Sequence, residues 1–316
     1  MFLKRPHIAL LFIGILLFSS CSSKFMKLQK KGTTEQKYLA ANDYYKKGDY
    51  YKAGTLFEEI IPLLKGDSLA EQSQFYNAYS QFQQKQYSMS AYLFKSFYAT
   101  YANSPLAEEA FYMYAFSMFK DSPNYNLDQT STLTAIDALQ TFINSYPDSK
   151  YAESCNQNLK DLRHRLEEKA YEKAKLYYKT SGVTIANFKA AVVAIDNFQK
   201  DFPDSEYIEE LSFLKVQAQF ELAEVSFETK QRERYTAALQ FYEDFIDAFP
   251  KSKYIKQAEK VYDGSTKGLE KVAKYEQQVK EFKAKEAERA AKEKADKENT
   301  AKKDEKVGIN ELKTNK

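Results

Sequence analysis

The chain has 316 residues and a formal net charge of +3, which is too small to indicate a nucleic-acid-binding protein. It contains nine Gly, seven Pro, no Trp, 25 Tyr and 23 Phe, and this scarcity of helix breakers favours a helical globular chain. The two Cys, Cys21 and Cys155, lie far apart in different sequence contexts, so we predict neither a disulfide nor a metal pair.

Residues 1–20 have the organisation of an export signal. A positive start is followed by an apolar run at residues 8–18, which is too short to span about 30 Å of hydrocarbon. The run ends in Phe18-Ser-Ser-Cys21, which resembles a bacterial lipobox, in which the Cys becomes the lipidated N-terminus. The alternative is an ordinary secretory peptide followed by a chance Cys. We expect lipidation at Cys21 and a polar tether over residues 21–34.

The residues after Cys21 indicate where the anchor would lie. Residues 22–27, Ser-Ser-Lys-Phe-Met-Lys, contain no acidic residue. They lack the Asp that resembles an inner-membrane retention signal, and they lack the acidic run that marks surface-exposed lipoproteins. We therefore expect a lipid anchor on the periplasmic face of the outer membrane.

One helical pattern occurs three times, at residues 135–151, 191–207 and 238–254. Each copy has apolar residues at i, i+4, i+7 and i+11, which places one apolar stripe along a helix of about three turns. A Pro that cannot continue the helix follows, and then a Ser that can cap the next helix. Three copies in register indicate a repeat protein rather than a single amphipathic helix.

The repeats begin near residue 35. Ala41, Gly48, Ala53 and Phe57 resemble a tetratricopeptide repeat (TPR), with small residues where two helices touch and Gly at the tight turn between them. Equivalent residues recur 37 positions later, and those of the first helix recur again 37 positions after that. We therefore predict an all-α TPR solenoid of five helical hairpins.

The predicted solenoid has a joint and a tail. TPR units one to three occupy residues 35–149, and a joint helix with units four and five occupies residues 150–265. Residues 150–180 contain no Gly or Pro and keep helical spacing, which predicts one or two extended helices between two sub-arrays. Over residues 266–316 the apolar pattern ends in a closing helix, and we expect a Lys/Glu/Ala-rich tail that is helical and then disordered.

The sequence offers few residues for catalysis or metal binding. Its two His are His7, in the signal, and His164, on a charged stretch of the joint helix. It has no Gly-rich phosphate loop and no His, Cys or carboxylate cluster with ligand spacing. No Ser-His-Asp arrangement can form without a His base. We predict that the protein is not an enzyme and takes no cofactor or metal, and that Cys155 packs between helices.

The surplus of aromatic residues suggests a binding surface. In the TPR pattern the first helix of each unit lines a concave surface, to which the residues one and four positions after its small residue point. In the first two units these residues are Asn42, Tyr45, Tyr79 and Phe82. With the adjacent Lys46 and Gln83 they are the candidate groove residues. A groove with aromatic walls and amide donors suits an extended or hairpin peptide that carries aromatic side chains. The alternative is that Tyr45 and Phe82 only pack between neighbouring units.

Several features together resemble the BamD family of outer-membrane protein assembly factors: the lipobox, five TPR units, the corner Tyr146-Pro-Asp-Ser149, an enlarged third-unit loop and the run at residues 168–179. The resemblance covers about residues 15–265. It implies a non-enzymatic lipoprotein subunit of the Bam complex, which folds β-barrels into the outer membrane. In that family the N-terminal units receive unfolded barrel substrates, and the C-terminal units dock on the periplasmic domains of a BamA-like barrel subunit. The runner-up is another periplasmic TPR scaffold, for example in cell-wall or division complexes.

Four residues near the turns of units four and five are candidate contacts for the barrel subunit: Phe188, Arg232, Arg234 and Tyr235. The two Arg follow a helix rather than join an apolar stripe, so we expect them to be exposed. Charged residues at the rim of an interface mostly set the rate of encounter with the partner and the register of the complex. The alternative is that the two Arg only solvate the turn.

Overall fold

The computed structural model describes residues 24–314, with side-chain exposure described as far as residue 297. The predicted export signal and Cys21 lie outside the described residues. Across residues 24–314 the regular structure is helical and contains no strand. The prediction of an all-α fold is therefore confirmed.

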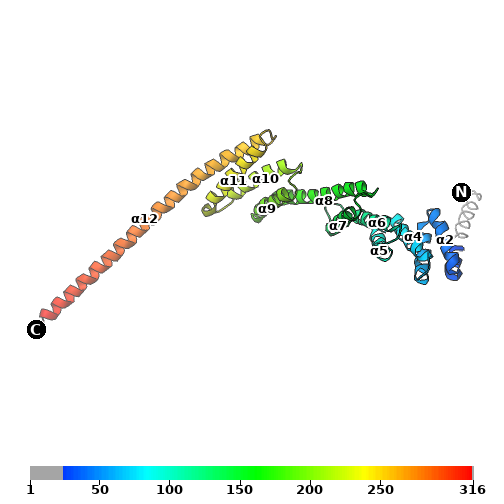
Figure 1. Cartoon of the computed structure of the whole chain (residues 1–316). Coiled ribbons are helices and arrows are strands. Elements are labelled where there is room, and N and C mark those ends of the chain that lie inside the picture. Colours follow the sequence, from blue (N-terminus) through cyan, green and yellow to red (C-terminus); the bar gives the residue numbers. More distant parts are fainter. Residues whose placement is uncertain (1–23, 315–316) are drawn as a thin grey trace, which may run out of the picture. The chain divides into compact units, whose positions relative to one another are not determined.

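The chain divides into two compact units. The amino-terminal unit contains the described residues up to Glu168, and the carboxy-terminal unit begins at Lys169. The boundary falls inside α8 (Ala152–Lys179), which is the extended helix that the sequence predicts (Figure 1).

The amino-terminal unit is built from three helical hairpins, each of which packs its two helices together. They are α2 (Thr34–Lys46) with α3 (Tyr50–Ile60), α4 (Leu69–Gln83) with α5 (Tyr87–Thr100), and α6 (Ala107–Asp121) with α7 (Thr130–Ser145). A short 3₁₀ helix, η1 (Ile61–Leu63), follows α3. Ala41 and Ala53 are fully buried where α2 meets α3, and Gly48 takes a φ of +78° in the turn between them, as the TPR pattern predicts.

Residues 24–31 are helical, although the sequence predicts a polar tether there. Phe25 is 7% exposed and meets the Tyr44 ring edge-on at 5.8 Å, while Leu28 packs against the same core. These two apolar residues are three positions apart, so a helix places them on one face. The difference arises because two apolar side chains are too few to reveal an amphipathic helix in sequence, yet they are enough to dock one.

Three Ser residues stand at corners that follow a hairpin, and two of them, Ser149 and Ser252, are predicted caps. In three corners the Ser hydroxyl donates to a Glu in the first turn of the preceding hairpin's first helix. The pairs are Ser104 with Glu71, Ser149 with Glu108 at 2.7 Å, and Ser252 with Glu209 at 2.6 Å. The same hydroxyls accept a backbone N–H two residues further on, from Leu106, Tyr151 and Tyr254. Each such Ser therefore ties the segment that follows a hairpin to the first helix of that hairpin.

The Tyr that ends each copy of the repeated pattern stacks on an aromatic ring of an earlier first helix. The three pairs are Tyr151 on Tyr112 at 4.1 Å, Tyr207 on Tyr171 at 4.1 Å, and Tyr254 on Phe213 at 4.8 Å. Their interplanar angles are 6°, 17° and 3°. The repeat in the sequence thus produces a repeated aromatic contact.

The carboxy-terminal unit contains the last part of α8, α9 (Ala186–Asp201), α10 (Ile208–Glu224), α11 (Glu228–Ala248) and α12 (Ile255–Thr314). Tyr171 and Ala174 of α8 share a core with Ile195 and Phe198 of α9, which makes the fourth hairpin. Helices α10 and α11 make the fifth. The prediction of a five-hairpin TPR solenoid is confirmed.

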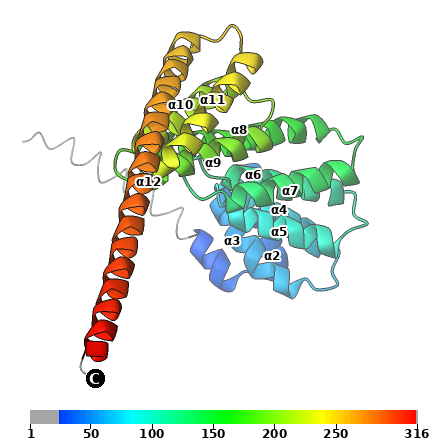
Figure 2. The same ribbon diagram turned by 90° about the vertical axis from the view of Figure 1, so that its left-hand side faces the viewer.

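Helix α12 lies along both helices of the fifth hairpin (Figure 2). Two glycines allow this close approach. A Cβ on Gly264 would lie 2.7 Å from the Phe220 ring, and one on Gly268 would lie 2.5 Å from the Tyr235 ring. Packing continues as far as Val272, which is 2% exposed, whereas the side chains of residues 283–297 are exposed.

Within residues 24–314, no helix combines the length and the apolar content needed to cross a membrane. Among the side chains described for residues 24–297, no group of three or more His, Cys, Asp or Glu is placed to hold a metal ion.

Candidate functional site

Aromatic side chains on the first helices of the amino-terminal unit contact one another from hairpin to hairpin. Tyr45 of α2 stacks on Tyr76 of α4 with ring centroids 4.6 Å apart. Phe82 of α4 lies 5.6 Å from Phe116 of α6. The Tyr79 hydroxyl of α4 donates a hydrogen bond to Glu109 of α6. We call the surface formed by these side chains with Tyr112 the first-helix face.

The predicted groove residues divide into two classes on this face. Tyr45, Tyr79 and Phe82 are half-buried, because each packs against aromatic rings of its own or the next hairpin. Asn42 is also half-buried, and its Nδ2 donates to the Tyr38 carbonyl at 2.9 Å. Lys46 and Gln83 are exposed.

Packing between neighbouring hairpins, which the sequence raised as the alternative, is therefore present at Tyr45 and Phe82. Both rings nevertheless keep part of their surface open to solvent. Their role in a binding groove stays a prediction.

Two tyrosines of this face, Tyr45 and Tyr79, have raised pKa values. Burial raises the pKa of Tyr45 to about 12, with smaller contributions from Tyr50 and Tyr76. Burial raises the pKa of Tyr79 further, and the hydrogen bond to Glu109 adds to the effect, because an ionised phenol could not donate to a carboxylate.

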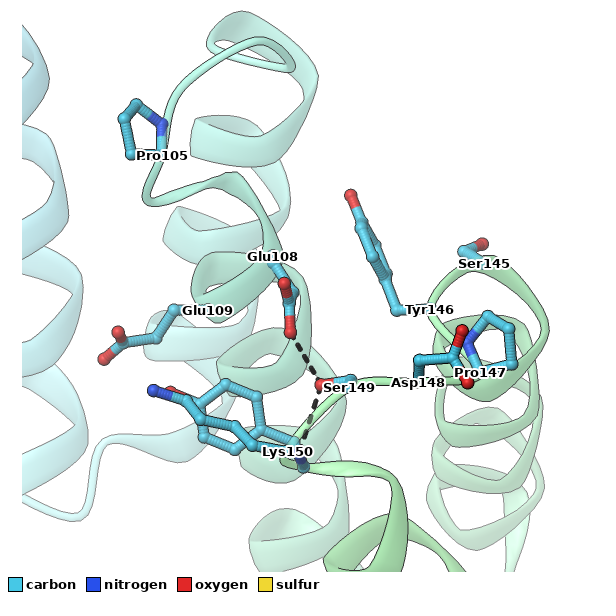
Figure 3. Close-up of a pocket in the computed structure, with 10 residues that line it drawn as sticks. Pro105, Glu108, Glu109, Ser145, Tyr146, Pro147, Asp148, Ser149 and Lys150 are labelled. Carbon is cyan, nitrogen blue, oxygen red and sulfur yellow. Dashed lines mark hydrogen bonds between the residues drawn. The ribbon is translucent and has the colours of Figure 1, made fainter.

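A cavity of about 620 Å³ adjoins the first-helix face, between the start of α6 and the corner that joins α7 to α8. It is lined by Pro105, Glu108, Glu109, Ser145, Tyr146, Pro147, Asp148, Ser149, Lys150 and Tyr151. Figure 3 shows the Glu108 side chain of α6 directed at Ser149 of the corner, with the hydrogen bond between them, while the Glu109 side chain points away from Tyr146 and Asp148.

The cavity combines carboxylates with aromatic walls. Glu108, Glu109 and Asp148 carry three negative charges against one positive charge on Lys150. Lys150 donates to the Tyr151 hydroxyl, and this bond raises the pKa of Lys150. The arrangement can accept hydrogen bonds from peptide N–H groups or from a basic side chain while the rings cover apolar parts of the ligand.

Sequence reasoning missed this cavity, although it contains the corner Tyr146-Pro-Asp-Ser149 that the sequence analysis singled out. Glu108 and Glu109 lie about 40 residues away from the corner in sequence. They come next to the corner only in the folded chain, where the first turn of α6 lies against it.

The chain matches a family model described as "YfiO: Outer membrane lipoprotein" over residues 30–187 and 184–295. These two matches cover more than half of the chain. The chain belongs to this family of outer membrane lipoproteins. Residue 30 lies in the docked helical segment and residue 295 lies on α12, so the YfiO family match includes both described units.

No curated protein matches this YfiO family member in sequence. Among solved structures, one match is described as "crystal structure of Podosopora anserina putative kinesin light chain nearly identical TPR-like repeats". It is 13% identical, covers 69% of this chain and 94% of its own, and has a TM-score of 0.29.

Two of the predicted partner contacts on the carboxy-terminal unit of this YfiO family member are buried. Phe188 is 6% exposed and packs with Ala191, Ala218 and Leu222. Tyr235 is 7% exposed and packs with Val272 of α12. Neither ring presents a surface to a partner, so this part of the prediction is corrected.

The two predicted Arg lie in the first turns of α11, and both have partners. Arg232 is about half exposed, and its guanidinium makes a two-bond pair with Glu276 of α12, at 3.0 and 2.6 Å. Arg234 is half-buried and donates to the Ser226 hydroxyl. Arg232 therefore helps to hold α12 on the hairpin, so reversing its charge would disturb that contact before any partner.

Exposed apolar side chains occupy the turns of the fourth and fifth hairpins instead. Val183 is 87% exposed and Ile185 is 48% exposed in the α8–α9 turn, while Val225 is 49% exposed and Phe227 is 84% exposed in the α10–α11 turn. The two turns lie at one end of the unit, because the start of α9 and the end of α10 share a core cluster. We call these four residues the apolar turn patch. Apolar residues in turn sequences were the signal that could have revealed it.

Proposed function

We propose that this lipoprotein is a non-enzymatic subunit of the outer-membrane β-barrel assembly machinery of the BamD type. In this proposal it binds unfolded barrel segments through the amino-terminal unit and a BamA-like barrel subunit through the carboxy-terminal unit. The observation that supports it most is the first-helix face, which runs across three hairpins and ends at an acidic, aromatic cavity. Membership in an outer membrane lipoprotein family supports the location.

The first-helix face suits a barrel segment that has not yet folded. Such a segment is extended, carries aromatic side chains, and still has unpaired backbone N–H groups. Half-buried rings at Tyr45 and Phe82 can cover aromatic side chains, and Glu109 can accept N–H groups. Since rigid aromatic rings lose little conformational entropy on binding, a few such contacts provide most of the affinity.

The apolar turn patch is the proposed docking surface for the barrel subunit. Val183 and Phe227 are the most exposed of the large apolar side chains described in the carboxy-terminal unit, up to residue 297. Exposed side chains of this kind, gathered on neighbouring turns, typically mark a protein–protein interface. Arg232 is excluded as a free contact because Glu276 already pairs with it.

Affinity purification of the lipoprotein from detergent-solubilised membranes tests the proposal. We expect a large β-barrel protein with periplasmic repeat domains to co-purify, and depletion of the lipoprotein should lower many outer-membrane barrels together. Co-purification of cell-wall or division proteins, without the barrel subunit, would instead support a different periplasmic TPR scaffold.

Peptide binding tests the first-helix face directly. A double variant, Tyr45→Ala with Phe82→Ala, should weaken binding of an aromatic-ended barrel peptide by about tenfold or more. The matched control is Tyr51→Ala with Tyr92→Ala, which removes rings that are 67% and 68% exposed on the second helices of their hairpins. Glu109→Gln serves as a second test because it leaves the ring packing intact. Equal binding by all these folded variants would refute the substrate role of this face.

A further inference from the structure

The docked helical segment at residues 24–31 has a second face that its packing does not use. Phe25 and Leu28 point into the first hairpin, and the Gln29 amide donates to Glu59 at 2.6 Å. The remaining side chains on the outer face are Lys24, Met26, Lys27, Lys30 and Lys31, all of which are exposed. The segment is therefore amphipathic, with a core face and a basic face.

Three of these lysines converge on one cavity. Lys24, Lys27 and Lys31, spaced by three and four residues, line a cavity of about 340 Å³ together with Leu28, Gly32 and Gln36. Within the described residues, no carboxylate pairs with these lysines. The site is thus a concentration of positive charge for which the described part of the chain provides no counter-ion.

The position of this cavity in the chain limits what can occupy it. Lys24 is three residues from Cys21, so covalent geometry keeps it within about 11 Å of the predicted lipidated residue. If Cys21 is anchored, the basic face stands at the level of the phospholipid headgroups. Lysine ammonium groups suit the phosphodiester oxygens found there.

We infer that the basic face of residues 24–31 is a second membrane-binding site, which takes the phosphate headgroups of anionic phospholipids next to the lipid anchor. The helix is packed on the first hairpin, so this contact holds the α2–α3 end of the amino-terminal unit at the membrane surface. A flexible tether would not do so. The inference rests on lipidation at Cys21 and not on the barrel-assembly role.

Vesicle binding by the mature chain carrying Cys21→Ser isolates this site from the acyl chains. With its lysines unchanged, this chain should bind vesicles of phosphatidylcholine mixed with phosphatidylglycerol and should not bind vesicles of phosphatidylcholine alone. The triple variant Lys24→Gln, Lys27→Gln and Lys31→Gln should lose binding by on the order of 100-fold, since each lysine near an anionic surface contributes roughly fivefold. Replacing the same lysines with Arg should preserve binding.

The matched control changes the same number of charges on the exposed part of α12, as Lys283→Gln, Lys285→Gln and Lys292→Gln. It should bind like wild type, and circular dichroism should show both triple variants to be folded. Equal binding by the two triple variants, or equal binding to neutral vesicles, would overturn the inference. Displacement by millimolar inorganic phosphate would overturn it too, because the site would then be one for a free anion.

A labelled, lipidated chain tests the same inference without changing a charge. Met26 is 43% exposed on the basic face, and Tyr92 is 68% exposed on α5 of the same unit. A fluorophore at Met26→Cys should be quenched by headgroup-labelled lipid in reconstituted membranes, whereas one at Tyr92→Cys should not. Similar quenching at the two positions would contradict a fixed contact of the helix with the membrane.

Discussion

Several tyrosines of the first helices donate their hydroxyls to carboxylates of the next hairpin. Tyr79 donates to Glu109, Tyr171 donates to Glu210 at 3.0 Å, and Tyr178 donates to Glu221 at 2.6 Å. Burial is the main reason why the pKa values of all three tyrosines are raised. Each bond exists only while the phenol is protonated, so these contacts stabilise neighbouring hairpins at neutral pH.

Alkaline pH should therefore weaken the fold. A tyrosine whose folded pKa lies above its unfolded value of about 10 stabilises the protein fully below that value, and this stability is lost as the pH rises through the folded pKa. We expect the free energy of unfolding, measured by urea titration, to fall from about pH 10 upward. The double variant Tyr79→Phe with Tyr178→Phe should show a shallower fall. The exposed Tyr92→Phe is the matched control, and an identical slope in the double variant would contradict the assignment.

The buried thiol of Cys155 should be nearly inert. Burial raises its pKa to about 11, and its side chain is fully enclosed in the α6–α7–α8 core. Since only the thiolate is nucleophilic, alkylation by iodoacetamide at neutral pH should be slower than that of an exposed Cys by at least about 100-fold. Mass spectrometry of the mature chain carrying Cys21→Ser gives the rate, and Tyr92→Cys in the same chain provides the exposed reference. Comparable rates would show that the core around Cys155 opens.

At the scale of elements, the main additions to the repeat are the corners and the last helix. The corners at Ser104, Ser149 and Ser252 are each tied to a Glu of the hairpin that they follow, and α12 closes the array by lying against α10 and α11. Gly264 and Gly268 appear in sequence as weak points in a helix. In the structure they are the positions at which aromatic rings of the fifth hairpin touch the α12 backbone.

Substituting Gly268 should separate α12 from the hairpin. A Cβ there would lie 2.5 Å from the Tyr235 ring, which is 7% exposed and has little room to move. We expect Gly268→Val to destabilise the carboxy-terminal unit by about 1–3 kcal/mol in chemical denaturation. Gly182→Ala is the control, because nothing lies within 4 Å of its added Cβ and the change should be neutral or slightly stabilising. Equal stability of the two variants would show that α12 does not pack as described.

Structural features that depend on residues close together in the sequence were predicted correctly, whereas features that depend on distant residues were not. Ala41, Gly48 and Ala53 belong to a periodic pattern within one hairpin, so the sequence predicted their roles correctly. The burial of Tyr235 depends on Gly268 and Val272, more than 30 residues further along the chain, and no local pattern reports it. The cavity at the α7–α8 corner depends in the same way on the distant start of α6.

At the scale of the whole molecule, the chain carries different surfaces on its two units. The amino-terminal unit has the first-helix face and the basic face of residues 24–31. The carboxy-terminal unit has the apolar turn patch. Because each unit has its own core, a surface variant of one unit should leave the other folded and able to bind. Binding of substrate and of the barrel subunit should therefore be separable by mutation.

The apolar turn patch allows the sharpest test of this separation. Val183→Ser with Phe227→Ser removes two side chains that are 87% and 84% exposed, so the fold should be unaffected. Co-purification of the barrel subunit should fall by about tenfold or more, because exposed apolar anchors contribute most of the energy of such an interface. Binding of the aromatic-ended barrel peptide should stay at the wild-type level.

The control is Leu63→Ser with Tyr92→Ser in the amino-terminal unit, where both side chains are 68% exposed. It removes a similar amount of exposed apolar surface, so a general effect of surface hydrophobicity would appear in it as well. If the turn variant retains the barrel subunit, the docking surface lies elsewhere on the chain. If it loses the barrel subunit and the peptide together, the two units do not act independently. Loss of the barrel subunit alone would show that the two units carry separate binding surfaces, which simultaneous binding of a substrate and the barrel subunit requires.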